Sequence, residues 1–483
     1  MRIQEIYHKN KKNIFFSQNM DVAAHRNELI NIFEKDKFDK KNNESLKNLN
    51  LKNFFDFNYN YSASEETSLV NNNKPNSYSI VLVNGKCAKY KDKKIEITNL
   101  SKENYNDFSK HSTIEKNDHF VNLNSLFLNS GFKIIIKKNT SIKINISNIV
   151  TEDGLTIFQK NNIICEEGSS LTLIEEYENK NNSMYNILNV IKLEKDSSFN
   201  HFVLQDNSFN HNLIITNHSS CKKNSNYTQR VYNFSDGYVR NFHYSELTEI
   251  NSEVDLQGIF FLKDKNSSNN KTFIKHLAED CKSNQVYKGI LNDRSKATYF
   301  SNTHVDQVAQ KTEGYQLSKG ILLSDNASYF SKPELKIYAD DVKCSHGSTI
   351  GPIDVNAIFY LRSRGMSKIA ATKILISSFI NEELNSIDNE ASQYVHFGKS
   401  LSAQLNGNSG DLQRHIYAEG GFSTNEPKTF EGQSLPPEHP LYFNHIGGNK
   451  TNIYGPKGQQ QQDNPLSVCR AVMVRNLKYK FFN

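Results

Sequence analysis

The sequence is poor in cysteine and contains no closely spaced cysteine pair. Its six cysteines, at positions 87, 165, 221, 281, 344 and 469, form no CxxC motif. Scattered thiols of this kind are typical of a reducing compartment and argue against a disulfide framework. The N-terminus lacks the apolar segment of a secretory signal, and no apolar run is long enough to span a membrane. We therefore expect a cytoplasmic protein without membrane contact.

Several catalytic motifs are also missing. The chain has no GxxxxGK[ST] phosphate loop, no HExxH helix and no GxSxG elbow, which excludes the commonest nucleotide hydrolases, zinc peptidases and serine hydrolases. Charge of one sign is not concentrated either, because 58 Lys and Arg are interspersed with 52 Asp and Glu. A nucleic-acid footprint would need basic residues gathered on one face. We therefore expect no nucleic-acid partner.

Hydrophobic residues make up only 37% of the chain, but 30 Phe and 23 Tyr supply enough apolar surface for a core. From Ser79 onward, short β-branched runs such as SIVLVNG, FKIIIKK and NLIITNH alternate with polar turns, and no helical period occurs between about 130 and 340. Many short strands without helices predict a sandwich, a barrel or a β-solenoid. No fixed-length repeat decides among the three.

Helical patterns flank the strand-rich region. Residues 20–36 carry apolar side chains at amphipathic spacing. After the strands, Asp354 is suited to cap a helix that ends at Gly365. Ser367 is suited to cap a second helix that continues to about residue 386.

These patterns divide the chain into four parts. We expect an N-terminal helical and loop region (1–76), a β core (77–350), a C-terminal helical cap (351–388) and an atypical tail (389–483). The tail holds 6 of the 9 prolines and 10 of the 22 glycines, so we expect it to be poorly ordered.

Cys344 and His346 are the candidate metal ligands. They lie two residues apart in a strand-like segment, so a period of two places both side chains on one face and Lys343 on the other. A thiol and an imidazole together suit iron or zinc. The spacing alone leaves structural roles open, because cysteine is often a buried small hydrophobe and a lone histidine is usually hydrogen-bonded.

The sequence motifs around this pair resemble those of SufD, a family of subunits of the SUF iron–sulfur cluster assembly scaffold. The resemblance rests on YADDVKCSHG at 338–347, FYLRSRG at 359–365, YKGIL at 287–291 and QKT at 310–312. Separate blocks in the same order are more specific than one short motif, and the resemblance covers roughly residues 20 to 387.

This resemblance implies a right-handed parallel β-helix (β-solenoid) core, in which rungs stack and alternate residues point inward. It implies a SufB-like heterodimer partner and a SufC-like ATPase that docks on the helical cap, where Phe359, Tyr360 and Leu361 lie. A transient iron–sulfur cluster would form at the SufB-like interface, with His346 first and Cys344 second as ligands. No catalytic residue and no tightly bound cofactor are implied, so the chain alone would be a non-catalytic scaffold subunit.

Two alternatives stay open. A β-helix polysaccharide lyase or glycosidase would need clustered carboxylates; Asp340-Asp341 is the conspicuous pair, and a turn explains it equally well. A SufB-like scaffold subunit is the other alternative, and the YKGIL and ADDVKCSHG motifs favour SufD over it. β-Elimination by the isolated chain would support the first alternative.

Overall fold

The computed structural model describes residues 3–10, 20–35, 70–74, 76–87, 89–100, 118–177, 182–206 and 212–385. The chain divides into two compact units, Met1–Ile353 and Asp354–Asn483. The tail expected at 389–483 lies outside the described residues.

The first unit contains two ten-stranded sheets and, among its described residues, the helices α1 (Ile3–Asn10), α2 (Met20–Lys35) and α5 (His119–Phe127). Sheet B contains, in spatial order, β1 (Val70–Lys74), β2 (Ser77–Val83), β6 (Ser141–Ile149), β8 (Ser170–Tyr177), β10 (Ser198–Gln205), β12 (Asn226–Asn233), β14 (Glu253–Leu262), β16 (Lys282–Leu291), β18 (Thr312–Leu322) and β20 (Val342–Pro352). Sheet A contains β3 (Tyr90–Lys91), β4 (Ile95–Asn99), β5 (Ser130–Ile136), β7 (Leu155–Cys165), β9 (Ser183–Leu193), β11 (Asn212–Cys221), β13 (Tyr238–Leu247), β15 (Ser267–His276), β17 (Lys296–Val305) and β19 (Ser328–Ile337).

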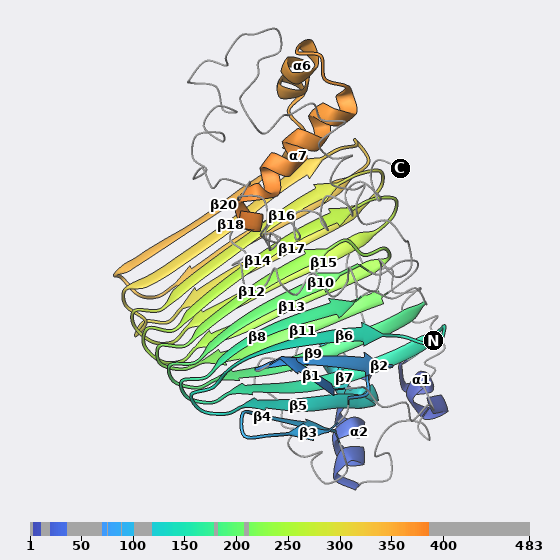
Figure 1. Ribbon diagram of the computed structural model, residues 1–483, viewed down its shortest axis with the longest axis vertical. Helices are drawn as coiled ribbons and strands as arrows, with labels where there is room; N and C mark the ends of the chain where they lie inside the picture. The colour runs from blue at the N-terminus through green and yellow to red at the C-terminus, as the bar shows by residue number, and fades with distance from the viewer. Residues whose placement is uncertain are drawn as a thin grey trace, which may run out of the picture. The chain divides into compact units, whose positions relative to one another are not determined.

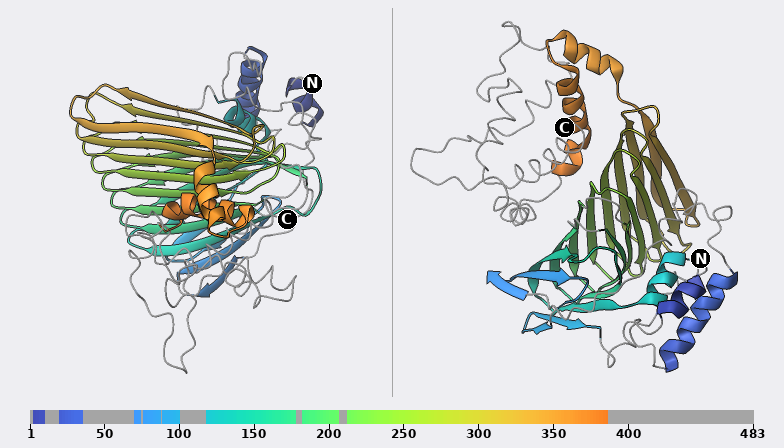
Figure 2. Two further views of the ribbon diagram at one scale, coloured as in Figure 1. Left: turned by 90° about the horizontal axis from the view of Figure 1, so that it is seen from above. Right: turned by 90° about the vertical axis from the view of Figure 1, so that its right-hand side faces the viewer.

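From β5 onward the chain alternates between the two sheets, so each rung gives one strand to each (Figure 1). Neighbouring strands within a sheet are parallel from β5 to β19 and from β2 to β20. Antiparallel strand pairs occur only at the first rungs of the described chain, where β1 meets β2, β3 meets β4 and β4 meets β5. Figure 2 shows the rungs stacked one upon the next. The predicted parallel β-solenoid is confirmed.

The rungs differ in length, which explains why the sequence shows no fixed repeat. Ser170 pairs with Ser198, and Ser198 with Asn226, at steps of 28 residues. Asn212 and Tyr238 are 26 residues apart, whereas Lys296 and Ser328 are 32 apart. The register is kept although the period varies, because the turns absorb the difference.

One edge of the solenoid is built from left-handed turn residues. Asp196 and Asn224 both have φ of +56°, a conformation that Asn, Asp and Gly tolerate better than other residues. The Asp196 N–H donates to the Lys223 carbonyl at 2.9 Å, in the turn of the next rung. A following serine hydroxyl then donates to the carbonyl three residues back, as Ser197 does to Glu194 at 2.6 Å. Equivalent left-handed residues stand at Asn139, Gly168, Asn251, Asp280 and Lys311.

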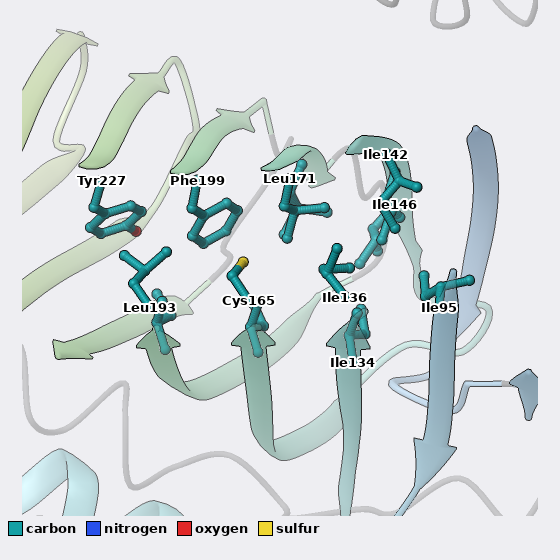
Figure 3. Close-up of a cluster of buried hydrophobic side chains, with 14 of the residues drawn as sticks. Ile95, Ile134, Ile136, Ile142, Ile146, Cys165, Leu171, Leu193, Phe199 and Tyr227 are labelled. Atoms are coloured by element: carbon teal, nitrogen blue, oxygen red, sulfur yellow. The ribbon is translucent and has the colours of Figure 1, made fainter. Parts of the chain in front are cut away.

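The inward faces of the first rungs pack into an apolar core. Ile134, Cys165 and Leu193 come from sheet A, and Leu171 and Phe199 come from sheet B (Figure 3). Each of these side chains is at most 1% exposed. Full burial of one such side chain contributes roughly 1.5–3 kcal/mol. Because one face of each strand supplies this core, a chain with few hydrophobic residues still folds.

The N-terminal helices cover the outer face of sheet A at its first rungs. The predicted helix at residues 20–36 is present as α2, while α1, α5 and β1 were not predicted. All nine residues of α5 are buried, and its apolar side chains cluster with those of α1 and α2 against Phe158, Met184 and Ile214. These helices therefore close the outer face that the first strands would otherwise expose.

A buried ion pair fastens α5 to the solenoid. Asp118 caps the helix, and its second carboxylate oxygen lies 2.7 Å from Arg240 Nη2. The guanidinium of Arg240 also lies over the rings of Phe120 and Phe242. Burial alone would raise the pKa of Asp118, but the charge and hydrogen bond of Arg240 outweigh it and hold that pKa below the usual range. The carboxylate therefore stays charged where it caps α5.

Candidate functional site

The solenoid ends in β19 and β20, the outermost strands of sheets A and B. No described strand pairs with the far edge of either. Most of their residues are half-buried or exposed, in contrast to the rungs beneath. Unpaired strand edges offer free backbone donors and acceptors to another chain. This end of the first unit therefore carries backbone donors and acceptors that no described strand pairs with.

Cys344 and His346 both lie on β20, on the face that looks into the solenoid. They pair in register with Gly314 and Gln316 of β18. Lys343 points the opposite way and contacts Glu313, with 3.4 Å between Nζ and Oε1. The alternation expected from the sequence is therefore present. His346 is exposed and Cys344 half-buried, because no further rung of the described chain covers them.

Cys344 packs against a small group of apolar side chains at the β19–β20 end of the solenoid. Val305, Ala309 and Ala339 form that group, and Val342 and Cys344 both pack against it. Burial raises the pKa of the Cys344 thiol above its ordinary value. The free thiol is therefore protonated at neutral pH, and a metal would have to displace its proton.

A column of inward-facing polar residues runs beneath His346. In sheet B the register stacks His201, Gln229, Leu256, Gln285 and Gln316 directly below it. The four polar side chains among them, which exclude Leu256, are each at most 3% exposed. Buried polar groups are tolerated only when they are hydrogen-bonded, so their partners matter.

The upper part of this column is held by hydroxyl groups from sheet A. Gln316 Nε2 donates to Thr303 Oγ1 at 2.7 Å, and Ser301 Oγ donates to Gln316 Oε1 at 2.9 Å. Gln285 Nε2 donates to the same Thr303 oxygen at 2.8 Å. The floor beneath His346 is thus a rigid polar layer.

The lower part contains a fully buried contact between a histidine and a glutamate. His201 Nε2 lies 2.9 Å from Glu175 Oε2, and the two side chains are 0% and 2% exposed. Gln229 then links His201 to His243, whose Nδ1 lies 3.1 Å from Gln229 Oε1. The sequence does not reveal this polar interior, because its members become neighbours only when the rungs of unequal length are aligned.

The remaining described cysteines lie in the interior. Cys87, Cys165, Cys221 and Cys281 are buried, as expected for thiols in strand-like runs. Burial raises the pKa of Cys165 and of Cys221 to about 12, so both stay protonated. Within the described ranges, no group of three or more His, Cys, Asp or Glu side chains is placed to hold a metal ion. Cys469 lies outside those ranges.

The conspicuous Asp340-Asp341 pair lies in the last turn of the solenoid. The Asp341 carbonyl accepts from the Lys311 N–H, and its own N–H donates to Gln310 Oε1 at 3.0 Å. Both contacts join this turn to the preceding turn along the edge that is built from left-handed turn residues. The Asp341 backbone therefore belongs to a turn, which is the role that the sequence offered beside carbohydrate chemistry.

The second unit begins with two helices, α6 (Val355–Ser363) and α7 (Lys368–Asn385). Asp354 caps α6 as expected, accepting from the Asn356 and Ala357 N–H groups, and Gly365 follows with φ of +90°. Ser367 Oγ accepts from the Ala370 N–H at the start of α7.

The three cap residues expected to bind a partner differ in exposure. Phe359 is 73% exposed, whereas Leu361 is only 4% exposed. Tyr360 is half-buried, with the Arg364 guanidinium 5.1 Å from its ring centroid. Leu361 therefore belongs to the packed side of α6, and the exposed apolar face consists of Phe359 with Val355, one turn before it.

A search of the described residues for a membrane-spanning helix found none that is long and apolar enough.

The chain is similar to a described family and to several known proteins. Residues 148–379 match the family described as SUF system FeS cluster assembly, SufBD core domain. The iron–sulfur cluster assembly protein SufD of Escherichia coli (strain K12) is 28% identical over 247 residues, which are 50% of this chain and 58% of that protein. An iron–sulfur cluster assembly SufBD family protein of Synechocystis is 28% identical over 287 residues, 56% of this chain and 63% of that protein. SufD of Plasmodium falciparum is 28% identical over 268 residues, 52% of this chain and 17% of that protein.

Proposed function

We propose an iron–sulfur cluster assembly function for this chain, which is SufD-like and carries the SufBD core domain over residues 148–379. In this proposal it is a non-catalytic scaffold subunit that works with a SufB-like partner and a SufC-like ATPase. The observation that carries it is the position of Cys344 and His346 on the inner face of the solenoid's unpaired end. The relatives it resembles are named for cluster assembly, and nothing in the described site favours carbohydrate chemistry.

The number of ligands supports a partner at this end. Iron in iron–sulfur clusters is usually held by four ligands in all, and each cluster needs several protein donors. Cys344 and His346 supply two at most. A second solenoid placed against β19 and β20 would bring further donors and would satisfy the free strand edges in the same step.

His346 is the stronger ligand candidate of the two. Its imidazole is exposed and can bind iron in its neutral form. The Cys344 thiol is half-buried with a raised pKa, so binding metal through it requires loss of a proton. Iron and sulfide are the substrates of this site.

The helical unit supports ATPase docking. Val355 and Phe359 form an exposed apolar face on α6, at 69% and 73% exposure. Helices commonly present such i, i+4 pairs to a hydrophobic groove of a partner.

Co-expression with the SufB-like and SufC-like partners tests the proposal. The wild-type chain should co-purify with both, and the complex should develop visible cluster absorbance when supplied with iron and sulfide. His346→Ala should assemble normally and lose most of that absorbance, because alanine removes the imidazole without altering the strand. His8→Ala, at an exposed histidine of α1, is the control. Failure of the wild-type chain to co-purify with either partner would contradict the proposal. Normal cluster absorbance of the His346→Ala complex would contradict it as well.

A further inference from the structure

We draw no further inference here: the strongest candidate, the outer face of sheet A at β17 and β19, which carries the ring pair of Phe300 and Phe330 and the exposed side chain of Lys336, is a surface patch for which nothing in the described part of the structure shows what covers it.

Discussion

At the scale of single residues, the solenoid interior contains buried titratable side chains, of which His243 is one. His243 is 2% exposed, and burial lowers its pKa to about 3. Its two ring nitrogens are occupied by Gln229 and by Ser245, at 3.1 Å and 2.8 Å. Neutral imidazole satisfies these contacts, whereas a buried cation would face no described carboxylate directly.

This burial predicts an acid-sensitive fold. In the unfolded chain His243 takes up a proton near pH 6.5, but in the folded chain only near 3. Between these values the unfolded state binds more protons, so stability falls as pH falls through the window. One histidine contributes a slope of about 1.4 kcal/mol per pH unit there. Urea unfolding at several pH values should show this slope reduced by that amount in His243→Asn.

An exposed histidine provides the control for that measurement. His8→Asn, on α1, should leave the slope unchanged. If His243→Asn kept the full wild-type slope, acid sensitivity would have to come from other groups. His276, whose pKa burial lowers to about 4, would be the next to test.

At the scale of elements, α6 has one buried face and one exposed apolar face. Ile358 and Leu361 are buried, while Val355 and Phe359 are exposed. Phe359→Asp should therefore weaken ATPase binding with little change in thermal stability. Leu361→Asp buries an uncompensated charge and should destabilise the helical unit by several kcal/mol. A pull-down with the SufC-like subunit and a thermal melt of each variant distinguish the two effects.

Binding and melting of Phe359→Asp together show whether the exposed face of α6 binds the ATPase. Loss of binding by Phe359→Asp with an unchanged melt supports docking on this helix. Unchanged binding by Phe359→Asp would show that the ATPase docks elsewhere.

At the scale of the whole first unit, stability is built rung by rung, and each rung is covered by the next. The last described rung lacks such a cover, and it exposes Tyr338 by 61% and Ile337 by 38%. Exposed apolar groups beside unpaired strand edges are typical of an interaction surface.

A charge at this end of the solenoid should weaken pairing with the SufB-like subunit. Tyr338→Asp places a carboxylate where we expect a partner, and its desolvation on binding is costly. We expect at least about tenfold weaker pairing, equivalent to about 1.4 kcal/mol, measured by light scattering of mixed subunits. Ile250→Asp is the matched control, since Ile250 is 40% exposed in a turn remote along the chain. Equal pairing by both variants would place the interface away from this end.

The sequence by itself determined the local features of this protein. Alternation along β20 separated Cys344 from Lys343, because strand geometry has a period of two whatever surrounds it. Asp354 and Gly365 marked the ends of α6, because capping depends on a few neighbouring backbone groups. The Asn, Asp or Gly followed by Ser or Thr at the turns would also have revealed the rungs, had their variable spacing been allowed for.

Only the tertiary structure decided what lies beside what. Ser283, Gly314 and Cys344 are about one rung apart in sequence but stack in one column, and His276 reaches that column from the opposite sheet. Rung lengths between 26 and 32 residues hide this register from any fixed period. Likewise, Phe359 and Leu361 are equally apolar in sequence, and packing alone buried one and exposed the other. Both outcomes depend on which segments pack together, which the order of residues along the chain does not state.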